Sequence, residues 1–244
     1  MTITLQEQVS GYNPPEHWQP QKLKYILRLR KGNKNDGLTE KNLLSLSYGN
    51  IIRKDIEQTE GLVPASYEGY QIVEPGDIVL RLTDLQNDKR SLRQGLVRER
   101  GIVTSAYDAV YSGPEHDPEF WYFFLYALDI MKYYYSLGGG VRQSISFKDF
   151  PNAWILAPDK SEQEAIVLEL KKSLEAMNSI VALIGGNRSA QVAEPDSLLD
   201  FLNKRKQAVI VQGIMAPQMS EEFKISDEAL RQAVSSQKDL PGGL

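Results

Sequence analysis

The pattern of apolar residues changes near residue 160, and this change sets the strongest limit on the possible folds. Before it, short apolar runs alternate with Gly and Pro, which is typical of strands and turns. After it, apolar residues recur at helical spacing. We therefore expect four regions: an N-terminal lead-in at 1–13, an α/β (α+β) domain at 14–160, a long helical segment at 161–215 and a polar C-terminal tail at 216–244.

The helical segment has its own start and stop signals. Ser161 is expected to cap a helix, with Glu164 at the capping-box spacing. Gly185–Gly186 should end this helix and Pro195 should start a second one, so 161–215 forms either a helical hairpin or one broken long helix. No second copy of the segment exists in the chain to cover the apolar faces, so they are expected to pair two chains as a coiled coil. The expected dimerisation residues are Ile166, Leu170, Leu174, Met177, Val181, Ile184, Leu198 and Leu202.

Three further elements are expected in the rest of the chain. A turn at Pro75–Gly76–Asp77 leads into a strand, and 101–107 forms a second strand that 108–111 extends. The aromatic-rich stretch 118–137 is long enough for one helix, which the three glycines after it should end. Residues 226–235 could add a short helix to the tail.

Composition excludes several classes of protein. The chain has no cysteine, which rules out disulfides and thiolate metal sites. Residues 1–10 lack the basic stretch of a signal peptide, and no apolar run is long enough to span a membrane. We therefore expect a cytoplasmic protein.

Catalytic patterns are few. Residues 13–16 (Asn-Pro-Pro-Glu) resemble the motif by which DNA amino-methyltransferases hold a flipped base, but Glu16 replaces the aromatic residue and no Gly-rich loop precedes it. Residues 159–162 pair two acids with a lysine as a nuclease would, although a helix cap explains them as well. A stand-alone nuclease or methyltransferase is the alternative function, and a helical scaffold without DNA contact is a third. We expect no metal site and no cofactor in this chain.

Basic and amide side chains suggest DNA contact. The net charge is −4, but nine Lys or Arg residues stand against two acidic residues between His17 and Lys54. Arg reads guanine and Asn or Gln reads adenine through paired hydrogen bonds, while Lys and Arg also hold phosphates. Two polar loops, at 87–94 and 142–144, combine these types. The candidate DNA-binding residues are Lys31, Lys34, Asn87, Lys89, Arg90, Ser91, Arg93, Gln94, Arg142, Gln143 and Ser144.

The order of these segments resembles the specificity subunits of type I restriction–modification systems. The resemblance covers roughly residues 14–215 and depends on the order and spacing of its segments. These are 15–18 (Pro-Glu-His-Trp) with 22–26, the turn and strand at 75–79, 83–95 (TDLQNDKRSLRQG) with 101–107, the closing stretch 142–158, the junction 161–166 (Ser-Glu-Gln-Glu-Ala-Ile) and 204–213.

The resemblance implies a target recognition domain at 14–160 followed by a helical spacer. In the family each such domain reads half of a split DNA target, and paired spacers set the gap and hold methyltransferase subunits. Those partners would bind S-adenosylmethionine, and restriction subunits would use ATP and Mg²⁺. The chain differs from the family in carrying one recognition domain and a spacer interrupted between Gly185 and Pro195.

Overall fold

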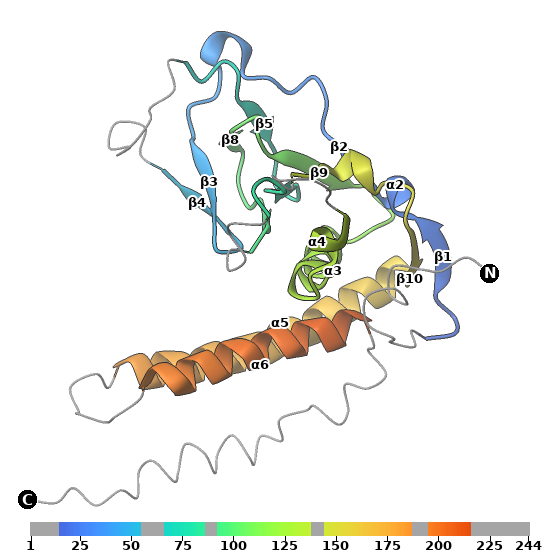
Figure 1. Cartoon of the computed structure of the whole chain (residues 1–244), viewed down its shortest axis with the longest axis vertical. Coiled ribbons are helices and arrows are strands. Elements are labelled where there is room, and N and C mark those ends of the chain that lie inside the picture. The colour runs from blue at the N-terminus through green and yellow to red at the C-terminus, as the bar shows by residue number, and fades with distance from the viewer. Residues whose placement is uncertain (1–14, 55–65, 86–91, 138–143, 187–194, 216–244) are drawn as a thin grey trace, which may run out of the picture.

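The chain folds as a sheet covered by one helix, which is in turn covered by a helical pair (Figure 1). The computed structural model describes residues 15–54, 66–85, 92–137, 144–186 and 195–215, and only the backbone between 180 and 202. Helix α3 (Pro118–Ile130) packs on the sheet, and α5 (Lys160–Gly186) and α6 (Pro195–Met215) pack on α3. The sheet is antiparallel, with the strand order β2 (Leu27–Leu29), β9 (Asp108–Ser112), β6 (Ile78–Leu80) and β7 (Gln94–Leu96).

Three two-stranded ribbons and four short helices complete the described fold. The ribbons pair β1 (Gln19–Lys22) with β10 (Trp154–Ala157), β3 (Leu44–Ser47) with β4 (Asn50–Arg53), and β5 (Gln71–Val73) with β8 (Gly101–Val103). The short helices are α2 (Leu23–Ile26), α4 (Tyr133–Leu137) and the 3₁₀ turns η1 (Asp36–Leu38) and η2 (Phe147–Asp149). The prediction of a mixed α/β domain is therefore confirmed.

The main core joins the domain to the helical pair. Trp121 and Phe124 of α3 share one apolar cluster with Leu170 of α5 and Ile214 of α6. A smaller cluster around Val73, Val79 and Val103 lies on the opposite side of the sheet. Residues from β1 to the end of α6 therefore contribute to one packed body.

Two expected elements are divided in the structure. The single strand expected over 101–111 is two strands, β8 and β9, because the chain turns where the Tyr107 amide donates to the Thr104 carbonyl at 3.2 Å. The single helix expected over 118–137 is α3 followed by α4. Lys132 adopts a left-handed conformation (φ 61°), which an α-helix does not accommodate.

Helix α5 begins at Lys160, two residues earlier than a cap at Ser161 predicts. Asp159, not Ser161, caps the helix: its carboxylate accepts one of the free amides of the first turn, from Glu162 at 2.9 Å, and the Ser161 hydroxyl instead donates to the Asp159 carboxylate. The expected capping box is therefore wrong, because the cap lies two residues towards the N-terminus. The apolar spacing of α5 is confirmed where side chains are described: Leu170 and Met177 are buried, and Ile166 and Leu174 are half-buried.

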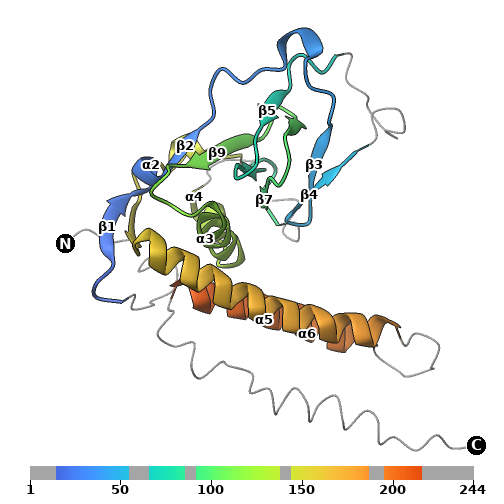
Figure 2. The ribbon, with the colours of Figure 1, turned by 180° about the vertical axis from the view of Figure 1, so that it is seen from behind.

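Helices α5 and α6 form a hairpin, with α6 returning alongside α5 (Figures 1 and 2). Gly213 of α6 lies so close to α5 that a Cβ atom there would be 2.5 Å from the Leu170 side chain. Of the two expected alternatives the hairpin is the one observed, and α6 covers part of the apolar face of α5 that we expected a second chain to cover. Pairing of two chains stays a prediction, and the side chains of Val181, Ile184, Leu198 and Leu202 lie outside the described residues.

Candidate DNA interface

The described residues at the ends of the two polar loops lie side by side. The first leaves the sheet after β6 and returns at β7, and the second returns at Ser144. The Ile145 amide donates to the Leu82 carbonyl at 3.0 Å, and the Asp84 amide lies 3.4 Å from the Ser144 hydroxyl. The structure therefore brings together two segments that are sixty residues apart in sequence. Asn87, Lys89, Arg90, Ser91, Arg142 and Gln143 lie outside the described residues.

Arg93 is a structural residue rather than a surface one. Its side chain is fully buried, and its guanidinium donates to the carbonyls of Thr83 at 2.9 Å and Asp84 at 3.4 Å. The Arg93 amide also donates to the Asp129 carboxylate at 2.7 Å. Arg93, at the C-terminal end of the first loop, is thus bonded to Thr83 and Asp84 at the N-terminal end of that loop. Our expectation that it contacts DNA is wrong for this structure, because a guanidinium held among backbone carbonyls has no access to a groove.

Gln94 also lies inside the protein. It is the first residue of β7, where it pairs with Leu80 of β6, and its side chain is fully buried. The polar loop therefore ends before Gln94, because β7, a strand that was not predicted from the sequence, begins there. Ser144 is exposed, as a DNA-contacting residue needs to be.

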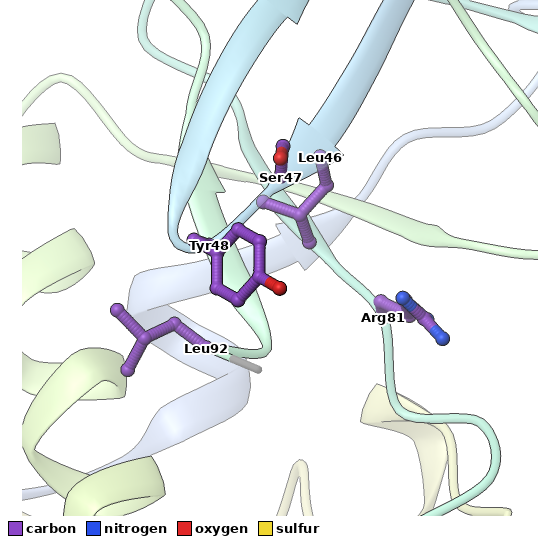
Figure 3. Close-up of a pocket in the computed structure, with 5 residues that line it drawn as sticks. All are labelled: Leu46, Ser47, Tyr48, Arg81 and Leu92. Carbon is purple, nitrogen blue, oxygen red and sulfur yellow. The ribbon is translucent and has the colours of Figure 1, made fainter. Parts of the chain in front are cut away.

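A hairpin turn lies beside these loop ends. Leu46, Ser47 and Tyr48, together with Arg81 and Leu92, line a shallow cavity of about 200 Å³ (Figure 3). Leu92 follows the first loop, and its side chain would be 2.8 Å from a Cβ atom on Gly49. The Tyr122 hydroxyl lies 3.2 Å from the Gly49 carbonyl and donates to it. The turn is therefore fixed against both α3 and the returning end of the first loop.

Sequence reasoning did not select Tyr48 and Arg81. Tyr48 is 72% exposed and points towards Arg81 across the cavity (Figure 3). A signal for the turn was present: Tyr-Gly separates the alternating run 44–47 (Leu-Ser-Leu-Ser) from a second, β-branched run, as in a two-residue hairpin. The approach of Arg81 depends on long-range packing and could not be inferred from spacing.

The two candidate lysines differ in position. The Arg30 amide donates to the Ala109 carbonyl at 2.8 Å, and the neighbouring Asp108 pairs with Leu80. Lys31 is exposed and follows β2 at the edge of the sheet where Arg81 follows β6. Strand β9 lies between these two strands. Lys34 is also exposed, but its backbone forms an isolated antiparallel β-bridge with Gln71 of β5. It therefore lies away from this edge of the sheet.

The basic character of residues 17–54 is partly neutralised in space. Arg30 forms an ion pair with buried Asp77, whose hydrogen bond raises the pKa of the guanidinium. Arg53 donates to Glu99 at 2.7 Å, and that hydrogen bond raises the pKa of Arg53 and lowers that of Glu99. Both acids come from the acidic part of the chain that follows. Asp77, from the Pro-Gly-Asp turn, is therefore a structural anchor.

The Glu162–Gln163 junction ties α5 to the domain. The Gln163 amide oxygen accepts from the Asp117 amide at 2.9 Å and from the Trp121 indole at 3.1 Å, and its nitrogen donates to the Pro158 carbonyl at 2.9 Å. Glu162 accepts from the Trp18 indole at 3.0 Å. These contacts fix the start of the helical pair relative to the sheet.

Among the residues that the structure describes, no three His, Asp or Glu side chains gather as metal ligands would. No helix of the described part is both apolar enough and long enough to cross a bilayer.

Neither a protein-family model nor a curated protein matches the chain. Three solved structures are similar to it. One, from a study of assembly and conformational transition in the type I R-M system, shares 16% identity over 84% of this chain and 47% of that chain, with a TM-score of 0.48. The S subunit of a type I restriction–modification system from M. genitalium shares 18% identity over 77% of this chain and 46% of its own, with a TM-score of 0.44.

The third is the HsdS subunit from Thermoanaerobacter tengcongensis, with 14% identity over 86% of this chain and 49% of its own, and a TM-score of 0.45. The chain spans about half the length of each of these solved chains. These three solved structures come from type I restriction–modification systems.

Proposed function

We propose that this chain is a specificity subunit of a type I restriction–modification system. It binds double-stranded DNA, reads one half of a split target and recruits methyltransferase subunits, which carry out the chemistry. Restriction subunits would join the same assembly. S-adenosylmethionine would be bound by the methyltransferase subunits, ATP and Mg²⁺ by the restriction subunits, and no cofactor by this chain. The assembly would act in the cytoplasm, where the DNA is.

The observation that carries this proposal is the convergence of three polar segments at one edge of a rigid domain. The ends of both candidate loops are joined through Leu82, Asp84 and Ser144, and the β3–β4 turn packs against Leu92 beside them. DNA readers commonly hold loops of this composition on a rigid scaffold, because the side chains must meet base edges in a fixed register. The ordered sequence resemblance supports the same function.

The helical pair supports the second part of the proposal. Helix α5 has 27 residues, about 40 Å at the usual helical rise, and projects towards the side of the molecule that carries the β3–β4 hairpin (Figure 1). The hydrogen bonds of Glu162 and Gln163 hold its first turn to the domain. A reader of a split target needs such a fixed arm, because the arm sets the distance to the second recognition domain. That second domain would come from another copy of this chain or from another specificity polypeptide.

Selection of duplex DNA by the purified assembly tests the proposal. The full chain bound to its methyltransferase subunits should enrich one short sequence from a random duplex pool, and the methyltransferase subunits alone should not. Equal enrichment with and without the chain would contradict a role in specificity. Enrichment of no sequence by either preparation would contradict DNA reading altogether.

A further inference from the structure

The β3–β4 ribbon has two chemically different faces. The strands pair Ser45 with Ile52 and Ser47 with Asn50, so these four side chains share one face. Lys54 continues the same alternation, and its amide donates to the Leu43 carbonyl at 2.8 Å. Asn50, Ile52 and Lys54 are exposed, and the two serines are half-buried. We call this set, Ser45, Ser47, Asn50, Ile52 and Lys54, the outer face.

The opposite face anchors the ribbon to the protein. Leu46 and Ile51 occupy the space above Gly95 of β7, where a Cβ atom would be 2.6 Å from Leu46 and 2.8 Å from Ile51. Leu44 belongs to the smaller core cluster. The ribbon therefore presents its outer face from a fixed position.

The β3–β4 turn places a bulky residue in a left-handed conformation that such residues rarely adopt. Tyr48 has φ 45° and Gly49 has φ 81°, which is the pair of left-handed residues of a type I′ hairpin. Asn is favoured at the first position, whereas a bulky residue is strained there. Burial does not compensate for this strain, since Tyr48 is 72% exposed. A strained and exposed aromatic residue on a rigid turn indicates selection for contact with something outside the chain.

We propose that the outer face of this ribbon reads base edges in the major groove of DNA, with Tyr48 at its leading end. This inference deepens the proposed function and rests on it. The major groove admits a two-stranded ribbon. Asn50 suits the paired donor and acceptor of adenine, Ile52 suits the methyl group of thymine, and Lys54 suits a phosphate.

Charge and polarity favour DNA over a protein as the occupant. The outer face contains one cation and no carboxylate, and Arg81 lies across the cavity from Tyr48. Ile52 is its only aliphatic residue, so the face offers little apolar area to a protein partner. Ser47 of this face also lines the cavity with Arg81 and with Leu92, which follows the first polar loop, so the face lies beside one of the other candidate DNA contacts.

The test uses the full chain assembled with its methyltransferase subunits and the duplex that this assembly selects. Tyr48→Asn should raise the melting temperature, because Asn accepts the left-handed conformation, yet should lower affinity for the selected duplex by about 5- to 100-fold. Ile52→Ala should leave the fold intact and weaken discrimination at one base pair of the target. Tyr25→Ala is the matched control, since Tyr25 is a similarly exposed tyrosine on α2 and should bind DNA like the wild type.

Each outcome decides between explanations. Wild-type affinity and discrimination in both ribbon variants, with a wild-type assembly that binds one sequence, would overturn this inference and leave the proposed function intact. A wild-type assembly without sequence preference would overturn both. Loss of methyltransferase subunits from the variants, measured by light scattering, with unchanged DNA affinity of the intact assembly, would show that the ribbon contacts protein instead.

Discussion

The buried side chain of Arg93 joins the two ends of the first polar loop. In the sequence it lies within a basic loop, but in the fold its guanidinium holds Thr83 and Asp84 at the loop's other end. Arg93→Ala should therefore lower the free energy of unfolding by about 2–4 kcal/mol, because it removes a fully buried side chain together with its two hydrogen bonds to backbone carbonyls. Chemical denaturation measures this change.

Arg98→Ala is the matched control for Arg93. Arg98 is exposed, and its partner Glu119 keeps a second ion pair with Lys171, so Arg98→Ala should cost about 1 kcal/mol or less. A stable Arg93→Ala protein whose affinity falls for the selected duplex alone would contradict the structural role and restore Arg93 as a base-reading residue.

Tyr122 links stability to alkaline pH. Burial raises the pKa of its hydroxyl to about 12, above the ordinary value of 10 in the unfolded chain. The folded state therefore favours the protonated form, and this contribution is complete below pH 10 and is lost as pH rises towards 12. We expect a loss of about 1–3 kcal/mol from this group. Tyr122→Phe should make the fall in unfolding free energy between pH 10 and 12 shallower, and an unchanged slope would contradict the assignment.

Two substitutions at the start of α5 test whether Asp159 is the residue that caps this helix. Asp159→Ala should lower the free energy of unfolding by about 1 kcal/mol, since its carboxylate accepts from the Glu162 amide. Ser161→Ala should change it by less than about 0.5 kcal/mol, because the Ser161 hydroxyl accepts no backbone amide of the helix in the described contacts. Thermal or chemical denaturation compares the two variants, and the reverse order would reinstate Ser161 as the cap.

The elements that the sequence predicts well are those that depend on local periodicity. Leu170 and Met177 are buried as their spacing indicates, and α6 starts at Pro195 as expected. The turn after β8 and the break at Lys132 were missed, because tertiary contacts decide them. At the candidate site, Ser144 and Lys31 could be selected by chemistry alone. The burial of Arg93 and Gln94 and the approach of Arg81 to Tyr48 could not, since they depend on partners distant in sequence.

At the scale of the whole molecule, the helical hairpin changes how a second copy could pair with the first. Leu170 packs on α6, so Leu170→Asp would unfold the hairpin rather than separate two chains. Leu168 is 57% exposed on the outer side of α5 and is available to a second chain. We expect two specificity polypeptides in each methyltransferase assembly, because a split target needs two recognition domains.

Leu168→Asp should weaken this pairing while leaving the melting temperature nearly unchanged, because the residue is exposed. Light scattering of the assembly gives the number of copies. One copy of this chain per assembly, with no other specificity polypeptide present, would contradict the pairing.

Mapping of methylated adenines in cells tests the claim of specificity most directly. Cells that carry the chain together with its methyltransferase subunits should methylate one interrupted sequence throughout their DNA, and an inverted repeat if two copies of the chain pair. Deletion of the chain should abolish that methylation, and the purified chain alone should neither cut nor methylate DNA. The same methylated sequence in cells that lack the chain, or turnover by the chain alone, would contradict a specificity subunit.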